Sequence, residues 1–262
     1  MKKYLSPSKL IPNLILLLTA VIFAIPLFFT LQKSVEVNGL YNYIIVWQGN
    51  DILQSFLNST IVTLTTVALV VVCVCFAAYA LSKLKIPLKG PIYLLFLTAL
   101  MIPGASLLFP TFQIIKQIGL IDNYMSLVGP YAALQIPFNL VIVKNYYDTI
   151  PNELLESAQI DGCSSFKAML KIMIPLSAPA LAVVITWTFI GVWNEFMYAF
   201  TFINDPNMCT LTSLPNKFIG IYSSQYELIF AVLVIIEIPI ILLYLFTQKQ
   251  LQEGLVAGSI KG

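Results

Sequence analysis

Six long stretches with at most one charged side chain dominate this sequence and limit the folds that it can adopt. Each reaches the roughly 20 residues that a helix needs to cross a bilayer core about 30 Å thick. Lipid offers no hydrogen-bond partner to the backbone, so a helix is the spanning structure that suits these lengths. The sequence therefore predicts an all-α, polytopic membrane protein whose membrane domain covers residues 10–248. Its six transmembrane helices are expected at about residues 10–32, 56–82, 91–115, 123–143, 177–203 and 228–248.

The composition supports this prediction and excludes several classes of function. Hydrophobic residues make up 59% of the chain and charged residues 10%, whereas soluble domains carry about 25% charged residues. The net charge of +2 gives no electrostatic basis for binding nucleic acid. The chain has no histidine, which removes most imidazole catalysis and metal ligation. We therefore expect no catalytic residue and no metal site.

The orientation in the membrane follows from the lysines, which are the only basic residues. The stretch at 10–32 is longer than the roughly 7–15-residue core of a signal peptide, and no small-residue cleavage site follows it. We interpret it as a retained anchor that follows a cytoplasmic segment of residues 1–9. With that segment inside, 11 of the 14 lysines fall on the inner side. The positive-inside rule therefore predicts that both termini, including a tail at residues 249–262, are cytoplasmic.

The longest inner connection, residues 144–175, is named here the signature loop. Pro151 suits the first turn of a short helix, and Gly162 suits the left-handed residue that ends it. Ser164 can cap a second helix, which has apolar residues at helical spacing along one face. Pro175 is expected to break that helix before the fifth span. The pattern predicts two short amphipathic helices, joined by a tight turn, at the cytoplasmic face of the membrane.

The signature loop resembles a known family. It contains Glu156-Ser157-Ala158, then Asp161-Gly162, and Pro175 farther on. This pattern resembles the cytoplasmic E-A-A…G signature of ABC importer permeases, with serine in place of the middle alanine. The wider string ESAQIDGCSSFKAMLKIMIP, the stretch Trp193-Asn194-Glu195-Phe196 and the tail from Gln248 resemble carbohydrate-importer permeases. The tail is similar to that of the second, shorter permease of maltose-type systems, and the likeness covers essentially the whole chain.

The resemblance implies a multi-pass subunit of an importer in the bacterial cell membrane. Its implied partners are a second permease subunit, two ATPase subunits, an extracytoplasmic sugar-binding protein and membrane lipid. The chain lacks the G-x-x-x-x-G-K-[ST] motif that cradles ATP phosphates, so the resemblance places ATP and Mg on the ATPases and no cofactor on this chain. It is a transport subunit, not an enzyme. The resemblance implies that these loop residues couple the permease to the ATPase: Glu156, Ser157, Ala158, Asp161, Gly162 and Pro175.

A second group of candidates surrounds Glu195, an ionisable residue at membrane depth. Such residues are costly in lipid and usually face the interior of a helix bundle. One interpretation places Trp193, Asn194, Glu195 and Tyr198 along the substrate path, where aromatic rings stack on sugars. The other has the polar side chains hydrogen-bond to neighbouring helices or to the partner permease, while the aromatic rings pack. Both interpretations stay open at this point.

The outer loop and the substrate complete the prediction. Leu214, Pro215 and Asn216 lie in an outer loop that, by the resemblance, contacts the binding protein. No lysine lies within the spans, which favours a neutral oligosaccharide or monosaccharide over an anionic glycerol phosphate ester; a permease for a glycerol-phosphate-type or other polyol substrate is the alternative. A standalone secondary transporter or channel would show internal repeats or an intramembrane ion path. A membrane enzyme would need a polar catalytic cluster, and the sequence displays neither feature.

Overall fold

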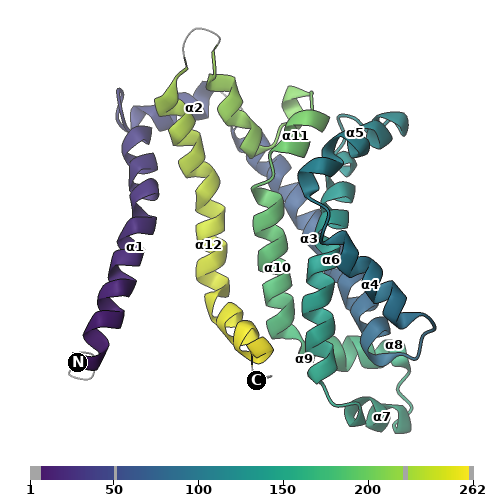
Figure 1. Ribbon diagram of the computed structural model, residues 1–262. Coiled ribbons are helices and arrows are strands. Elements are labelled where there is room, and N and C mark those ends of the chain that lie inside the picture. The colour runs from purple at the N-terminus through teal and green to yellow at the C-terminus, as the bar shows by residue number, and fades with distance from the viewer. Residues whose placement is uncertain (1–6, 50–51, 221–223, 260–262) are drawn as a thin grey trace. The chain divides into compact units, whose positions relative to one another are not determined.

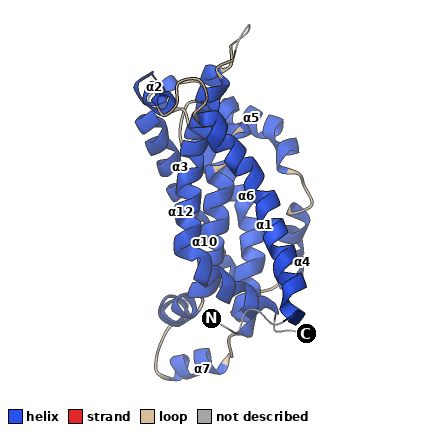
Figure 2. Ribbon diagram, turned by 90° about the vertical axis from the view of Figure 1, so that its left-hand side faces the viewer, coloured by secondary structure: helices blue, strands red, loops and turns tan. Residues whose placement is uncertain are grey.

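The described part of the chain is mostly helical. The computed structural model describes residues 7–49, 52–220 and 224–259, and it describes side chains for residues 11–48, 52–220 and 224–249. Within these ranges no strand is present (Figure 2), which confirms the all-α prediction for them. Most of the predicted N-terminal segment, residues 1–6, lies outside the described residues. So do residues 260–262 of the predicted tail.

Long helices alternate with short helical segments along the chain (Figure 1). In chain order they are α1 (Pro7–Ser34), α2 (Tyr41–Gly49), α3 (Ile52–Lys83), α4 (Lys89–Ala99), η2 (Gly104–Leu107), α5 (Leu108–Gln117), α6 (Met125–Thr149), α7 (Glu153–Ile160), α8 (Ser165–Ala168), η3 (Met169–Met173), α9 (Ile174–Leu176), α10 (Ala178–Trp193), α11 (Met197–Phe202), η4 (Pro206–Met208), η5 (Leu211–Phe218) and α12 (Tyr226–Ser259).

Four helices in the described ranges are long and apolar enough to cross a membrane by themselves: Ile11–Ser34, Ile52–Lys83, Met125–Thr149 and Tyr226–Lys249. Two bent helix pairs raise the number to as many as six if each pair forms one span. These findings support a polytopic membrane protein with four to six spans. The number six and the cytoplasmic position of the termini stay predictions.

The third predicted span, residues 91–115, differs from the expected straight helix. Its two halves, Lys89–Ala99 and Gly104–Gln117, meet at an angle of 93°. Pro103 adopts an extended backbone at the bend, and proline cannot donate the hydrogen bond that would continue the first helix. The following glycine lowers the local preference for helix further. The charge-free stretch is therefore a broken span or a re-entrant segment.

The fifth predicted span, residues 177–203, is also interrupted. Helix α10 ends at Trp193, and α11 begins at Met197. The predicted sugar-permease stretch beginning at Trp193 therefore forms the junction between two helices and does not lie inside one. Before α10, the segment Ser165–Leu176 meets it at 78°.

The chain divides into two compact units, each described by itself. The first comprises Met1–Ile52 and Leu214–Ile238. Its described residues include α1 and α2, which are joined by Asn42, whose amide donates to the carbonyls of Ser34 (3.0 Å) and Glu36 (2.8 Å). The second unit comprises Leu53–Ser213 and Pro239–Gly262 and contains helices α4 to α11 and nearly all of α3.

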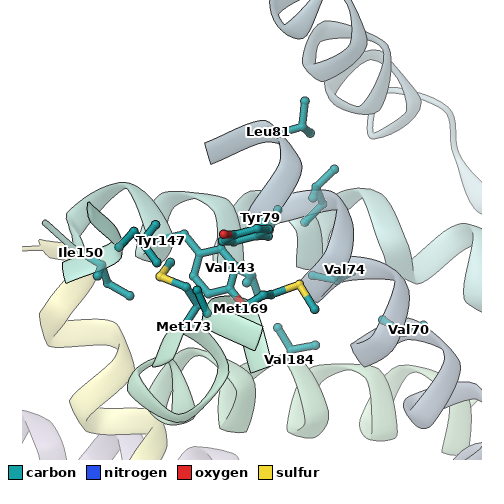
Figure 3. Close-up of a cluster of buried hydrophobic side chains, with 14 of the residues drawn as sticks. Val70, Val74, Tyr79, Leu81, Val143, Tyr147, Ile150, Met169, Met173 and Val184 are labelled. Atoms are coloured by element: carbon teal, nitrogen blue, oxygen red, sulfur yellow. The ribbon is translucent and has the colours of Figure 1, made fainter. Parts of the chain in front are cut away.

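The second unit has an apolar core that gathers α3, α6, the signature loop and α10 (Figure 3). Val74 and Tyr79 come from α3, Tyr147 from α6, and Met169 and Met173 from the π-helical turn η3. All are buried. In Figure 1, α7 and α8 lie at one end of this unit, beside the ends of α6 and α10, and α5 and α11 lie at the opposite end. The signature loop therefore rests on a packed base.

Candidate functional site

The signature loop contains the predicted pair of short helices, and the turn between them is tightly closed. Gly162 has a φ of +77°, the left-handed region that glycine adopts without cost. The Cys163 amide donates to the Ala158 carbonyl (2.8 Å), and the Gly162 amide donates to the Gln159 carbonyl (3.0 Å). These two bonds form a Schellman motif, which satisfies the last carbonyls of α7. The prediction for Gly162 is confirmed in its backbone role.

The second helix begins as expected, but the first helix starts slightly later. The Ser164 side chain accepts a hydrogen bond from the Lys167 amide at 3.4 Å and caps α8. Helix α7 begins at Glu153, with Asn152 at the N-cap, so Pro151 lies just before the helix and not in its first turn. Proline restricts the residue before it to extended conformations, and Ile150 has ψ of 124°. The helix break between α6 and α7 therefore falls at Ile150 and Pro151.

Pro175 lies within a helical segment, contrary to the expectation that it ends one. It belongs to α9, which follows the π-helical turn η3 without a gap. A π-helical turn shifts the hydrogen-bond ladder by one residue, and such turns are common where a helix bends. The helix ends two residues later at Ser177, whose backbone turns away from helix geometry. The break before α10 is therefore placed by Ser177 rather than by Pro175.

The outward face of α7 and α8 combines polar and apolar groups. Ala158 and Leu155 point inward and are buried. Glu156, Ser157 and Asp161 are exposed, and within the described ranges Glu156 forms no ion pair. Large apolar side chains are exposed beside them, namely Leu154 (45%), Ile160 (87%), Phe166 (57%) and Leu170 (43%). Clustered apolar exposure with a polar border is typical of a protein-interaction surface.

The second predicted group lies at the break between α10 and α11, where Glu195 organises the chain. The Tyr131 hydroxyl of α6 donates to the Glu195 carboxylate at 2.5 Å. The Tyr198 amide donates to the same carboxylate at 3.1 Å, so Glu195 also caps the start of α11. The Thr212 hydroxyl donates to the Glu195 carbonyl at 2.9 Å. Glu195 thus joins three separate segments, which matches the interpretation that its partners are neighbouring helices.

The aromatic candidates at this break pack inside the unit. Trp193 is 3% exposed and stacks against Phe189, with ring centroids 5.4 Å apart. Tyr198 is also 3% exposed, and its hydroxyl donates to the Gly104 carbonyl at 3.1 Å. Asn194 is the exposed member of the group. The structure therefore brings all four candidates together and leaves one of them accessible.

A small cavity adjoins Glu195. Six polar side chains contribute to its wall, and its volume is about 10 Å³, room for a single water molecule. A sugar ring does not fit there. The lining residues are Ser59, Val62, Thr63, Tyr131, Val192, Trp193, Glu195, Thr210 and Thr212.

The segment before the predicted binding-protein loop is fixed by residues that sequence reasoning missed. The Asp122 carboxylate accepts hydrogen bonds from the backbone amides of Asn204 and Asp205. These two bonds lower the pKa of the Asp122 carboxyl below its usual value. Asn58 of α3 donates to the carbonyls of Asn207 (2.8 Å) and Cys209 (2.9 Å). The sequence offered one signal, because a polar side chain early in an apolar span is usually there for a partner.

Replacement of Asp122 by asparagine is expected to lower the thermal stability of the protein at neutral pH. A depressed native pKa means that the ionised carboxylate contributes stability above its usual pKa of 3.8, and that this contribution fades as the pH falls below that value. The difference in unfolding temperature between wild type and Asp122→Asn should therefore be constant from pH 8 to pH 5 and shrink at more acidic pH. A difference that is equal at pH 7 and pH 3 would contradict the assignment.

The predicted contact residues of the outer loop belong to the first unit. Leu214 is fully buried, whereas Pro215 and Asn216 are partly exposed. All three lie in the short helical turn η5. Of the three predicted contact residues, only Pro215 and Asn216 are accessible to a partner in this conformation.

Comparison with known proteins identifies the family. Residues 74–256 match the family described as the binding-protein-dependent transport system inner membrane component. The chain belongs to this family. A relative named "Probable ABC transporter permease protein YurM", from Bacillus subtilis (strain 168), is 37% identical over 221 residues, which is 84% of this chain and 73% of the relative. The resemblance to sugar ABC permeases is thereby confirmed.

Two further comparisons agree. A relative named "Trehalose/maltose transport system permease protein MalG", from Thermococcus litoralis (strain ATCC 51850 / DSM 5473 / JCM 8560 / NS-C), is 36% identical over 214 residues, 80% of this chain and 74% of the relative. The crystal structure of a bacterial ABC transporter involved in the import of the acidic polysaccharide alginate superposes with a TM-score of 0.79. The match covers 95% of this chain and 99% of the alginate transporter chain at 22% sequence identity. It is therefore evidence for a shared fold.

Membership in this family fixes the broad setting of the sites described above. The protein is a membrane-embedded, multi-pass permease subunit of the bacterial inner membrane. Its relatives are permeases, which fits a transport subunit without its own ATPase. Among the described residues no group of three or more Cys, Asp or Glu could hold a metal ion.

Proposed function

We propose that this permease translocates a neutral oligosaccharide or monosaccharide, and that its signature loop couples translocation to ATP hydrolysis by partner ATPase subunits. In this proposal, a second permease completes the pathway, and an extracytoplasmic binding protein delivers the sugar. ATP and Mg remain on the ATPase subunits. Both termini and the signature loop are cytoplasmic.

The observation that carries the coupling proposal is the closed turn at Gly162. The Schellman motif holds α7 and α8 rigidly together, and the exposed apolar side chains around the turn are suited to a cleft in a partner. Glu156 is exposed and without an ion pair among the described residues, so a basic residue of the ATPase can pair with it. Such a pair orients docking more than it adds affinity. Asp161 and Ser157 lie on the same exposed surface.

The neutral-sugar proposal rests on the spans and agrees with the name of one relative. The four long candidate spans carry lysine only near their carboxyl ends: Lys33, Lys83 and Lys249 lie at or next to the last residue, and Lys144 lies five residues before it. An anionic substrate would gain from basic groups along its path. One relative is named for trehalose and maltose, which are neutral disaccharides. Asn194, exposed at the break between α10 and α11, is the proposed sugar-contacting residue, with Trp193, Glu195 and Tyr198 shaping the wall behind it.

The proposal is tested with the reconstituted complex and a panel of substrates. Affinity purification of the tagged permease should recover an ATPase subunit and a second permease in stable amounts. In nanodiscs with the binding protein, maltose, trehalose or a galactooligosaccharide should stimulate ATP hydrolysis several-fold, whereas glycerol 3-phosphate should not. Stimulation by glycerol 3-phosphate alone would favour the alternative substrate class. Substrate uptake by the permease without any ATPase would instead indicate a secondary transporter.

A further inference from the structure

The long helix α3 differs from the other candidate spans. It runs from Ile52 to Lys83 without a proline or a glycine. In contrast, α1, α6 and α12 each contain at least one proline, and the remaining two candidate spans are bent pairs. Sharp helix kinks arise mainly at proline, at glycine and at π-helical turns. Among the candidate spans in the described ranges, α3 is therefore the one best able to behave as a stiff rod.

The inner end of α3 is bonded to the link that leads into the signature loop. Lys83, its last residue, donates to the Ile150 carbonyl at 2.6 Å and to Asn152 Oδ1 at 3.0 Å. Ile150 and Asn152 lie in the three-residue link between α6 and α7. The positive charge also sits at the carboxyl end of α6, where the helix dipole favours it. Lys83 therefore holds the link at both of its ends.

Neighbouring bonds make this inner junction rigid. Ser82 donates to Asp148 Oδ1 at 2.6 Å, which joins α3 to α6, and within α6 Lys144 donates to Asp148 Oδ2 at 2.6 Å and orients that carboxylate. Beneath these polar groups, Leu81, Ile150 and Leu155 are buried in one apolar cluster; the first two are visible in Figure 3. This cluster joins α3, the link and α7. A shift of α7 is therefore transmitted to α3 as well as to α6.

The outer end of α3 is bonded to the segment that precedes the outer loop. Asn58 is fully buried. Its amide donates to the carbonyls of Asn207 and Cys209, and its oxygen accepts from Tyr124 (2.7 Å) and Gln54 (2.9 Å). These four bonds use the full capacity of an asparagine side chain. At the next residue, the Ser59 hydroxyl accepts from the Leu211 amide at 2.8 Å.

We propose that α3 is a strut that transmits motion between the outer segment Asn207–Leu211 and the coupling helix α7, with Asn58 and Lys83 as the positioning residues at its two ends. The two residues are 25 positions apart, so they are separated by about 37 Å along the helix axis. The inference rests on the proposed function, because it assumes that a binding protein acts outside and an ATPase inside. It adds a second route of coupling, which bypasses the turn at Gly162. Both ends of α3 are held by hydrogen bonds to backbone carbonyls. These bonds fix where the neighbouring segments lie and do not depend on the side chains of those segments.

The test measures how strongly the loaded binding protein stimulates ATP hydrolysis in the complete complex in nanodiscs. Stimulation is the ratio of the rates with and without binding protein loaded with maltose, or with whichever panel sugar stimulates the wild type most. Lys83→Met removes both bonds to the link and keeps much of the side-chain length. We expect the stimulation ratio to fall by about fivefold or more, the lower range of typical coupling between sites. Lys83→Arg, which can still donate to both acceptors, should recover most of the ratio.

Lys85→Met is the matched control. Lys85 lies two residues farther along, is exposed, and forms no described side-chain hydrogen bond or ion pair. In the Lys85→Met complex, the loaded binding protein should stimulate ATP hydrolysis as strongly as in the wild type. The strut proposal is wrong if the stimulation ratio of Lys83→Met lies within twofold of the wild-type ratio. It is also wrong if the ratio of Lys83→Arg is no higher than that of Lys83→Met. The proposed function survives that result, since it is tested by co-purification and by wild-type stimulation.

A double-mutant cycle keeps the proposal falsifiable if one variant assembles poorly. Asn58→Ala releases the outer end of α3, and assembled complexes are selected by size-exclusion chromatography before assay. If both residues act through one rod, breaking the second end adds little, and the double variant should match the more affected single variant. Losses of stimulation that multiply would show two independent effects and would overturn the strut.

Discussion

Gly162→Leu is expected to reduce sugar uptake by at least about 50-fold, within the range of strong coupling between sites, while the complex remains assembled. A leucine at a φ of +77° costs about 1–2 kcal/mol of backbone strain. A Cβ at this position meets no atom of the described residues within 4 Å. A loss of uptake greater than this strain explains must therefore arise where the turn meets a partner. Uptake by proteoliposomes and the subunit composition of the purified complex are the two measurements.

Gly119→Leu is the matched control for this experiment. Gly119 has a φ of +70°, and an added Cβ there likewise meets no described atom within 4 Å. It follows α5, at the end of the second unit opposite the signature loop (Figure 1). Both variants therefore carry the same backbone strain, and both should lower the unfolding temperature alike. Normal uptake by Gly162→Leu, or equal loss of uptake in both variants, would disprove ATPase coupling at the turn.

Glu195→Ala is expected to destabilise the permease by about 2 kcal/mol or more. Hydrogen bonds between helices in membranes contribute about 0.6 kcal/mol on average and up to about 1.7 kcal/mol each. The Glu195 carboxylate accepts from Tyr131 and from the backbone amides of Tyr198 and, at 3.4 Å, Ala199. Losing all three also leaves the buried Tyr131 hydroxyl without its acceptor. Thermal unfolding of the complex in nanodiscs measures the effect.

Glu195→Gln separates a structural role from a role in the substrate path. The amide oxygen still accepts a hydrogen bond from Tyr131, so stability should be largely retained. If Glu195 has only a structural role, through its hydrogen bonds within the chain, the sugar concentration that half-saturates transport stays unchanged in Glu195→Gln. A several-fold rise in that concentration at unchanged stability would instead place the carboxylate in contact with the sugar.

The regular parts of the fold were predictable because lipid leaves a chain few options. A helix was expected at 56–82, and α3 covers these residues; the turn at Gly162 was predicted from the need for a left-handed residue. Local rules suffice in such cases, since apolar length and glycine conformation depend little on distant residues. The family resemblance likewise rested on local patterns, namely those around Glu156, at Trp193-Asn194-Glu195-Phe196 and in the tail from Gln248.

The irregular parts could not be predicted because they depend on contacts distant in sequence. The break after Trp193 exists where Glu195 can bond to Tyr131 of α6, 64 residues earlier. The position of Lys83 at the link into α7 depends on how α3 and α6 pack, which hydrophobic patterning does not specify. Pro175 illustrates a third case: a π-helical turn accommodates a residue that usually stops a helix. Helix ends and breaks are decided by tertiary structure even in a membrane protein.

The shortness of α10 has a consequence for how the subunit faces its surroundings. Its 16 residues extend about 24 Å, less than the thickness of the hydrocarbon layer. The non-helical backbone at 194–196 then lies near membrane depth, where exposed peptide groups are tolerated only against protein or water. The side of the subunit that carries Asn194 must therefore turn away from the acyl chains. Where α10 crosses the hydrocarbon layer, this one interrupted helix therefore constrains which side of the second unit can face lipid.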